Sequence, residues 1–413
     1  MKVVQINAVY GKGSTGTIVR DIEQLCFHSG IECYVACPDT QVREARHGYV
    51  IGNTLDHKLH AALSRLHGKQ AYFSHIPTRS LLRWLDQIKP DIVQLHNLHS
   101  NYIHLNMLLD YLAKRDIRTI VTMHDCWFYT GGCFHYTADG CKGWLDKCGV
   151  CPQGKGDPTG ILGKKTAEIL EDRKRHLLAI PHLTVTGVSD WISNEARRTF
   201  LQKAHVVTIH NGVDLQVFKP RSSDLRERLG LQGKYVILGP ASKWLLPVNQ
   251  QVLIDFVHQM KEDEVLLLFG VWSGRQKDYL HTLGLTEKVL TYGFTHNRQE
   301  LAELYSFADV FANTSREDSL SLINVEAQAC GTPVVTFNQT GPKETVDEEN
   351  SFSVQAGNAT ELYEAVQRTR RLIHNDTVSH LVQFVCRNFE LNHTYSKYIG
   401  LYKTLYEANY RNR

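Results

Sequence analysis

The feature that most constrains this chain is a repeated alternation between short apolar segments and segments of helical period. In the first half, runs rich in valine and isoleucine occupy residues 2–9, 32–37, 91–97, 119–125, 182–189 and 205–214. Strands that are apolar on both faces and separated by helices are typical of a parallel sheet with helices on both sides. The first half therefore predicts a doubly wound α/β domain.

A second alternation begins after a polar, charged stretch. Its apolar runs occupy residues 235–242, 264–270, 289–294, 309–315 and 333–337. The 413 residues are enough for two domains that each bury a core. We therefore expect an α/β protein with two Rossmann-like domains, at 1–214 and 234–390, facing each other across a cleft. We expect 215–233 to be the linker, and 391–413 to form a C-terminal helix that packs back toward the first domain.

Charge and hydropathy exclude several classes of protein. The chain has 46 Lys and Arg residues and 43 Asp and Glu residues, which gives a formal charge of +3. A net charge this small creates no strong positive field that would attract nucleic acid. The start of the chain lacks the pattern of a signal peptide, and no apolar run reaches the roughly 18 residues that span a bilayer. We expect a cytoplasmic protein, with its ten cysteines in a reducing compartment.

A glycine-rich turn follows the first predicted strand. Gly11, Gly13 and Gly16 flank Ser14 and Thr15, either of which is suitable to cap the next helix. Glycine lets the backbone approach a ligand closely, and the N–H groups at a helix start attract anions. We predict a ligand contact here. The spacing is not the dinucleotide-binding fingerprint, and a flexible turn is the alternative.

Polar residues come directly after two neighbouring predicted strands. His96, Asn97 and His99 follow one strand, and His124 and Asp125 follow the next. Because Asp125 can fix the tautomer of its neighbour, His124 is the candidate for a catalytic role. A hydrogen-bonded structural role is the alternative for His96 and His99.

A loop at residues 126–155 is unusually rich in cysteine. Its four closely spaced thiols are Cys133, Cys141, Cys148 and Cys151. Four thiolates suit a tetrahedral structural zinc ion, which would supply folding energy that the small core of the loop cannot supply. Unligated thiols or a redox pair are the alternatives, and His135 or Cys126 could substitute as a ligand.

Basic residues follow two strands of the second series. Lys243 comes after the first of them, and Arg275 comes after the second beside Gly270 and Gly274. Such positions suit phosphate contacts from backbone and cation together. Ordinary exposed loop residues are the alternative for each.

Three carboxylates accompany a stretch with the pattern of a buried helix followed by a buried strand. Glu317 and Asp318 precede the apolar stretch, and Glu326 lies inside it. A buried carboxylate needs a partner, because its burial costs several kcal/mol. Eight residues of helix would place Asp318 and Glu326 roughly 80° apart, so both could face one ligand, such as a ribose diol. In the alternative interpretation, Asp318 stabilises the positive end of the helix dipole and Glu326 forms an internal ion pair.

The segment "EDSLSLINVEAQACGTPVV" resembles the signature helix of the retaining glycosyltransferases of family four, which have the GT-B fold. "LHNLHSNYI", "VTMHDCWFYTGGC", "HNGVD" and "ELYSFADVF" are similar, in the same order, to bacterial capsule, O-antigen and exopolysaccharide members of that family. The resemblance implies a hexosyltransferase-type enzyme. It would move a sugar from a nucleotide diphosphate sugar to a saccharide acceptor with retention.

The resemblance also implies roles for individual residues. Glu326 would bind the donor ribose, and Asp318 or Glu317 would contact the transferred sugar together with His124. The other donor-binding residues implied are Gly13, Ser14, Thr15, Lys243, Arg275, Ser319, Leu320 and Lys343. The acceptor-binding residues implied are His96, Asn97, His99 and Asp125.

Two departures from the family pattern affect the diphosphate site. Asp318 replaces a glutamate, and the usual Arg and Lys pair after the first strand of the second domain is reduced to a displaced Lys243. Losing a fixed cation could raise the barrier by several kcal/mol unless Lys243, Arg275 or Lys343 compensates. A nucleotide-sugar epimerase of similar build and a non-catalytic sugar-nucleotide-binding protein remain alternatives.

The resemblance implies no metal for the chemistry and an acceptor linked to a lipid such as undecaprenyl diphosphate. Such an acceptor would bring the first domain to the inner face of the cytoplasmic membrane. The segment 79–89 interleaves apolar side chains with Arg79, Arg83 and Lys89 and could touch a membrane. An ordinary core-facing helix is the alternative.

Overall fold

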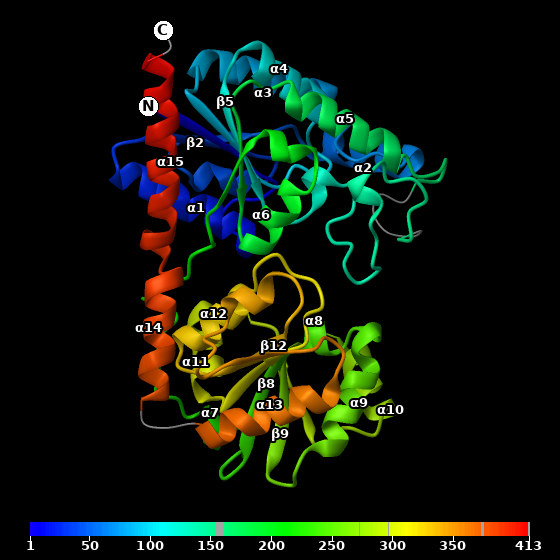
Figure 1. The fold of residues 1–413 in the computed structure, drawn as a ribbon, viewed down its shortest axis with the longest axis vertical. Helices are drawn as coiled ribbons and strands as arrows, with labels where there is room; N and C mark the ends of the chain where they lie inside the picture. The colour runs from blue at the N-terminus through cyan, green and yellow to red at the C-terminus, as the bar shows by residue number, and fades with distance from the viewer. Residues whose placement is uncertain (154–159, 272, 296, 373–375, 412–413) are drawn as a thin grey trace. The chain divides into compact units, whose positions relative to one another are not determined.

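The computed structural model describes residues 1–153, 160–271, 273–295, 297–372 and 376–411. The chain divides into two compact units (Figure 1). Unit 1 comprises Met1–Asn211 and Asn392–Arg413, and unit 2 comprises Gly212–Leu391.

Unit 1 is built on a parallel sheet. Within the described residues the sheet has seven strands in the order β3-β2-β1-β4-β5-β6-β7. Their bounds are β1 Lys2–Ile6, β2 Glu32–Cys37, β3 Gly48–Val50, β4 Ile92–Leu95, β5 Arg118–Met123, β6 Leu183–Gly187 and β7 His205–Thr208. The order reverses between β1 and β4, which pair directly with Val3 opposite Ile92. This reversal is the switch point at which doubly wound folds bind ligands.

Helices cover both faces of this sheet. Their bounds are α1 Gly13–His28, α2 Thr54–His67, α3 His75–Ile88, α4 Leu105–Lys114, α5 Thr166–Leu178, α6 Asp190–Arg197 and α15 Leu391–Arg411. Helices α1 and α15 lie on one side, and α3, α4 and α5 lie on the other (Figure 1). Gln5 of β1 donates to the Val19 carbonyl of α1, and Tyr402 of α15 donates to Gln94 of β4. The last helix is therefore part of unit 1.

Unit 2 repeats the same topology. Its sheet, counted over the described residues, has six parallel strands in the order β10-β9-β8-β11-β12-β13. The strands are β8 Tyr235–Pro240, β9 Glu264–Val271, β10 Val289–Gly293, β11 Val310–Asn313, β12 Val334–Phe337 and β13 Phe352–Val354. The helices are α7 Leu225–Arg228, α8 Ala241–Trp244, α9 Gln250–Gln259, α10 Gly274–Thr282, α11 Arg298–Phe307, α12 Leu322–Ala329, α13 Ala359–Leu372 and α14 Thr377–Phe389. The switch point lies between β8 and β11.

The predicted linker is packed into unit 2 rather than extended between domains. Within 215–233, Phe218, Leu225 and Leu231 are buried, and Leu225 belongs to the short helix α7. These three buried side chains are enough to fix the segment on the unit, because each fully buried one contributes roughly 1.5–3 kcal/mol.

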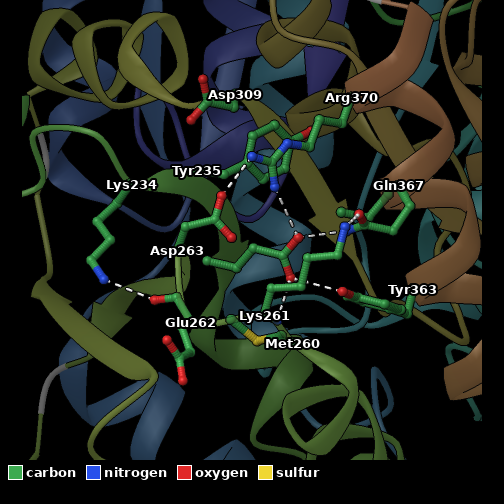
Figure 2. A network of polar contacts seen from close by, with 12 residues as sticks. Lys234, Tyr235, Met260, Lys261, Glu262, Asp263, Asp309, Tyr363, Gln367 and Arg370 are labelled. Carbon is green, nitrogen blue, oxygen red and sulfur yellow. Dashed lines mark hydrogen bonds and ion pairs between the residues drawn. The ribbon is translucent and has the colours of Figure 1, made fainter.

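A buried carboxylate joins α13 to the sheet of unit 2 at the amino ends of its strands. Glu264, at the start of β9, accepts hydrogen bonds from Tyr363, Gln367 and Arg370 of α13 at 2.9, 2.6 and 3.3 Å. Figure 2 shows these three side chains converging. The backbone N–H of Lys261 donates to the same carboxylate at 2.9 Å. Four donors satisfy a charge that would be costly if left alone.

Helix α3 matches the core-facing interpretation of residues 79–89. Leu81, Leu85 and Ile88 are buried, while Arg83 and Lys89 are exposed. Its apolar stripe is therefore used inside unit 1. In the part of the chain that the structure describes, no helix has the length and apolar character that crossing a membrane requires.

Trp244, the last residue of α8, packs into the core of unit 2. Trp244 is fully buried, its Nε1 donates to the Ala312 carbonyl at 2.8 Å, and its ring contacts Phe256 edge-on. A Cβ added at Gly239 would lie 2.2 Å from Trp244 Nε1 and 3.0 Å from the Ala312 oxygen. Gly239 is therefore needed for this contact.

We predict that Gly239→Ala destabilises unit 2 by about 1–3 kcal/mol, because the indole cannot move without losing its bond to Ala312. The measurement is the denaturant midpoint followed by Trp fluorescence and circular dichroism. Gly274→Ala is the matched control, since an added Cβ there meets nothing within 4 Å. Equal midpoints for the two variants would contradict the proposed packing.

Candidate functional site

The turn after β1 presents the start of α1. Gly11 and Gly13 have φ angles of +68° and +60°, a region that favours glycine. The helix begins at Gly13, and its N-cap is Lys12, without a side-chain capping bond. The expected capping role of Ser14 or Thr15 is therefore wrong, because both already lie in the first helical turn. Their backbone N–H groups belong to the set that has no intrahelical partner and can bind an anion.

Two histidines meet at the switch point of unit 1. His96 Nδ1 lies 3.0 Å from His124 Nε2, and their rings are stacked with centroids 5.3 Å apart. On its other side, His96 Nε2 lies 3.1 Å from Gln5 Oε1. The Gln5 amide donates through Nε2 to the Val19 carbonyl at 3.1 Å, which fixes Oε1 as the acceptor.

This chain of contacts determines the tautomers. His96 donates through Nε2 to Gln5, so its Nδ1 accepts from the Nε2–H of His124. In neutral His124, Nδ1 then carries the lone pair. Burial is the main cause that lowers the pKa of His124 to about 4, and burial followed by proximity to His124 lowers that of His96 well below its usual range. His124 is therefore a neutral acceptor around neutral pH.

A second pair lies beside the first. His99 Nε2 is 3.1 Å from Asp125 Oδ2, and Asp125 Oδ1 accepts from the Trp127 N–H at 2.8 Å. Burial opposes ionisation of Asp125, but the bond to His99 and the Trp127 N–H together lower its pKa below the ordinary value. Asp125 thus orients His99 rather than fixing the tautomer of His124, which His96 does.

Asn97 joins the ends of β1 and β4 through its backbone. Its N–H donates to Asn7 Oδ1 at 3.1 Å, and its carbonyl accepts from the Tyr102 hydroxyl at 2.8 Å. Gln5 and Asn7 were missed as site residues. Their position inside the apolar run 2–9 could have identified them, because a buried amide side chain requires hydrogen-bond partners.

At the switch point of unit 2, Asn249 connects the loops after β8 and β11. It is fully buried, and its Nδ2 donates to the carbonyls of Lys243 and Thr314, both at 2.9 Å. Its Oδ1 accepts from Arg316 Nε at 2.7 Å. Lys243 is half-buried in α8, and its backbone carbonyl is held by Asn249, another residue that the sequence interpretation missed.

The other predicted cations of unit 2 lie at the ends of different strands. Arg275 is exposed in α10, which follows β9. Lys343 is exposed in the 3-10 turn Gly341–Thr345, which follows β12. Lys243, Arg275 and Lys343 thus follow three different strands, β8, β9 and β12, at the carboxyl edge of one sheet.

The loop before α12 is locked to the turn after β12. The Asp318 N–H donates to Thr340 Oγ1 at 3.2 Å, and the Gly341 N–H donates to the Asp318 carbonyl at 3.1 Å. A Cβ at Gly341 would lie 1.9 Å from the Ser319 oxygen. Glu317 and Asp318 are half-buried, whereas Ser319 and Leu320 are buried.

The predicted helical relation between Asp318 and Glu326 is wrong. Helix α12 begins at Leu322, so Asp318 lies outside it and the 80° separation does not apply. Contacts with Thr340 and Gly341 hold the loop in a non-helical conformation instead.

Glu326 has an internal partner that is not an ion pair. The hydroxyl of buried Tyr305 donates to its Oε2 at 3.2 Å. Burial raises the pKa of Glu326 to about 7, and the proximity of Arg298 and the bond from Tyr305 oppose this rise. Arg298 itself lies over the Phe218 ring and 4.0 Å from Asp214. One carboxylate oxygen thus accepts from Tyr305, and the other, Oε1, can accept a hydrogen bond from a ligand.

The four loop cysteines of unit 1 line one small cavity of about 30 Å³. They are half-buried free thiols. The two alternative metal ligands that the sequence suggested, Cys126 and His135, do not line this cavity. Cys126 is fully buried, and His135 is half-buried.

Comparison with known proteins matches each unit to a glycosyltransferase family model. The family model described as "Glycosyltransferase Family 4" matches residues 16–217, and the model "Glycosyl transferases group 1" matches residues 236–371. The putative colanic acid biosynthesis glycosyl transferase WcaC of Escherichia coli is 22% identical over 98% of this chain and 100% of its own length. Spore coat protein SA of Bacillus subtilis is 28% identical over 40% of this chain, and the match spans about half (48%) of that relative.

Solved structures share the fold across the whole chain. Sucrose-phosphate synthase from Thermosynechococcus elongatus has a TM-score of 0.72 at 16% identity, covering 98% of this chain and 99% of its own. Anabaena HepE in complex with UDP has a TM-score of 0.65 at 16% identity, covering 98% and 100%. Since the two family models together match most of both units, the chain belongs to the group 1 and family 4 glycosyltransferases of the GT-B fold.

Proposed function

We propose that this enzyme transfers a sugar, with retention, from a nucleotide diphosphate sugar to a lipid-linked saccharide in bacterial surface polysaccharide synthesis. The observation that carries the donor assignment is Glu326, a half-buried carboxylate with Tyr305 on one oxygen. A ribose diol is suited to the other oxygen, as in other nucleotide folds. The likeness to WcaC over both chains supports the polysaccharide setting, and HepE has been solved with UDP and with UDP-glucose.

The chemistry we propose rests on hydrogen bonds rather than a metal. His124, with Nε2 directed at His96, offers Nδ1 to a hydroxyl of the transferred sugar. In unit 2, Asp318, whose backbone is held by Thr340 and Gly341, is the candidate for a contact with the transferred sugar. As the glycosidic bond to the diphosphate breaks, charge grows on the leaving phosphate, and preorganised donors stabilise it.

Cations for the leaving diphosphate are the part of the machinery that departs from the family pattern. Arg316 lies near the switch point, but its Nε is bonded to Asn249 and its Nη2 to the Val248 carbonyl. We therefore assign this role to Lys243, Arg275 and Lys343. A panel of UDP-, GDP- and dTDP-sugars, assayed for nucleotide release with and without a lipid-linked acceptor, tests the proposal. Release that depends on the acceptor supports transfer. A rearranged sugar nucleotide without acceptor would identify an epimerase, and binding without turnover a non-catalytic protein.

An exposed apolar surface on helix α2 supports the proposed lipid-linked acceptor. Helix α2 buries its polar residues His60 and Ser64 and exposes Leu55 (77%) and Leu59 (62%) to solvent. Leu66, on the same stripe, is also exposed. The outward stripe is the reverse of the usual pattern, in which the apolar face of a helix turns inward.

The inward polar face of α2 has a defined partner. His60 Nδ1 lies 2.6 Å from Ser74 Oγ, just before α3. Next to the outward stripe, the N–H groups of Ile161 and Leu162 donate to the carbonyls of Arg65 and Leu66 at 2.9 and 3.0 Å, which adds two exposed apolar side chains.

Exposed Lys58 and Arg65 flank this surface. Apolar side chains bordered by cations suit an anionic lipid surface, where the leucines enter the headgroup boundary and the cations remain at the phosphates. We therefore propose that α2 contacts the membrane, in place of the segment 79–89.

We predict that donor affinity weakens as the pH falls through about 7, because Glu326 then becomes protonated and loses acceptor capacity. The diphosphate diester of the donor does not titrate in this range. Glu326→Gln should bind less tightly at high pH and lose this pH dependence, and Glu326→Ala should weaken binding by about 1.5–3 kcal/mol. Donor titration by calorimetry on either side of pH 7 measures both. Glu262→Gln, exposed near the opposite edge of the sheet, is the control; a pH profile unchanged by Glu326→Gln would refute the ribose contact.

We predict that His124→Ala and Asp318→Ala lower turnover by about 100-fold while changing donor affinity much less, since both act at the reacting sugar. With the pKa of His124 at about 4, wild-type turnover should show no titration of this histidine around neutral pH. Steady-state kinetics and donor binding measure the split. His258→Ala, exposed on α9, is the control. Near-normal turnover in both site variants would place the reaction elsewhere.

We predict that the double variant Leu55→Ser/Leu59→Ser binds vesicles containing anionic phospholipid at least about tenfold more weakly, because two exposed leucines no longer enter the lipid. Sedimentation with vesicles measures binding, and added salt should weaken the wild-type interaction through Lys58 and Arg65. Val378→Ser, an exposed apolar residue of unit 2, is the control. Equal binding of wild type and double variant would exclude α2 as the contact surface.

A further inference from the structure

The cysteine-rich loop contains a cluster that the proposed sugar transfer does not use. Cys133, Cys141, Cys148 and Cys151 line one cavity of about 30 Å³ together with Trp144. All four are free and half-buried. We propose that these four residues bind one structural zinc ion as thiolates.

The loop has little regular structure of its own. Between Cys126 and Gln153, its described helical segments are the short 3-10 turns Trp127–Tyr129 and Gly143–Leu145. A segment of this kind buries too little apolar surface to fix its conformation alone, and a bound metal adds the missing free energy.

Local contacts already arrange the backbone around two of the thiols. The Gly131 N–H donates to Cys148 Sγ at 3.3 Å, a bond that stabilises charge on sulfur. The Cys148 N–H donates to the Gly143 carbonyl at 2.8 Å, and Trp144 Nε1 donates to the Cys141 carbonyl at 3.0 Å. The buried Trp144 ring packs on Tyr136 with centroids 4.6 Å apart. The packing of Trp144 on Tyr136 thus holds the turn between Cys141 and Cys148 in place.

Charge provides an independent argument. Arg173 of α5 is fully buried, with its guanidinium 3.5 Å over the Trp127 ring. Its Nη1 donates to the carbonyls of Trp127 and Thr130, and its Nε has no hydrogen-bond partner among the described residues. A buried cation needs negative charge nearby. Asp125 supplies one negative charge near this guanidinium, and Cys133 and Cys148 are also close enough to act on it electrostatically. A zinc ion with four thiolates would add a net charge of about −2.

Zinc binding must contract the loop. Within the described residues, no three of the four sulfur atoms lie within 4.8 Å of one another. Zinc–sulfur bonds of about 2.3 Å in a tetrahedron require the thiols to approach, through rotation of the cysteine side chains and closure of the small cavity. Metal binding and ordering of this loop are therefore coupled, as in small zinc domains.

The loop is connected to the histidine pairs of unit 1. The Cys126 N–H donates to the Phe134 carbonyl at 2.8 Å, and the Phe134 ring contacts His99 with centroids 4.5 Å apart. Phe134 directly follows Cys133, so a zinc ion on Cys133 restrains the residue that packs on His99 and, through it, Asp125. The metal would act as a positioning element without touching substrate.

Protein purified without chelator should contain about one zinc per chain by elemental analysis, and the four thiols should be alkylated quickly only after a chelator is added. Replacement by Co²⁺ should produce the sulfur-to-cobalt absorption of a thiolate site. Cys133→Ser and Cys148→Ser should each lose bound metal, whereas Cys386→Ser, an exposed cysteine outside the cluster, should retain it.

The wild-type protein alone can overturn the proposal, so a variant that fails to fold does not leave it open. Far less than one zinc per chain, with four thiols that react equally fast with and without chelator, excludes the site. A mass lower by two hydrogens with no metal would identify a redox pair instead. Donor binding by unit 2 should survive chelation, and because metal content is read without any sugar transfer, this test is independent of the proposed reaction.

Discussion

The reversal of strand order in each parallel sheet is the constraint on which the rest of this protein depends. At β1/β4 and at β8/β11, successive crossovers leave in opposite directions, so the connecting loops diverge at the carboxyl edge of the sheet. Backbone N–H groups and polar side chains can face a ligand there without disturbing the apolar layers. The histidine pairs, the Asn249 junction and the loop of Asp318 all lie at these edges.

Burying polar groups at these edges is possible because each is held by a specific partner. Gln5 orients His96, His96 orients His124, and Asn249 satisfies two carbonyls and one guanidinium. An orphaned amide or imidazole in the same place would cost roughly 1–3 kcal/mol. The same principle operates at the opposite edge of unit 2, where Glu264 receives donors from α13 and makes that helix part of the sheet's support.

Electrostatics gives the two units different chemical character. In unit 1, burial keeps His96 and His124 neutral, so the histidine pair works through hydrogen bonds and lone pairs rather than charge. In unit 2, burial instead raises the pKa of Glu326 toward neutrality, which makes its acceptor capacity sensitive to ligand and pH. The cations proposed for a diphosphate follow three different strands, and Arg316 is used to hold the loop after β11 in place. In this proposal, dispersed lysines and an arginine take the place of a fixed Arg and Lys pair.

The sequence by itself determined the two α/β domains, because apolar period is a local property that each strand and helix carries in its own residues. It also placed His96, His124 and Lys243 at strand ends. It did not predict the edge strands β3 and β13, whose three residues are too short to show a period. Only the tertiary structure decided which residues meet: Tyr305 with Glu326, Gln5 with His96 across 91 positions, and the outward leucines of α2. These depend on contacts between distant segments, which set burial and hydrogen bonding and which no local pattern contains.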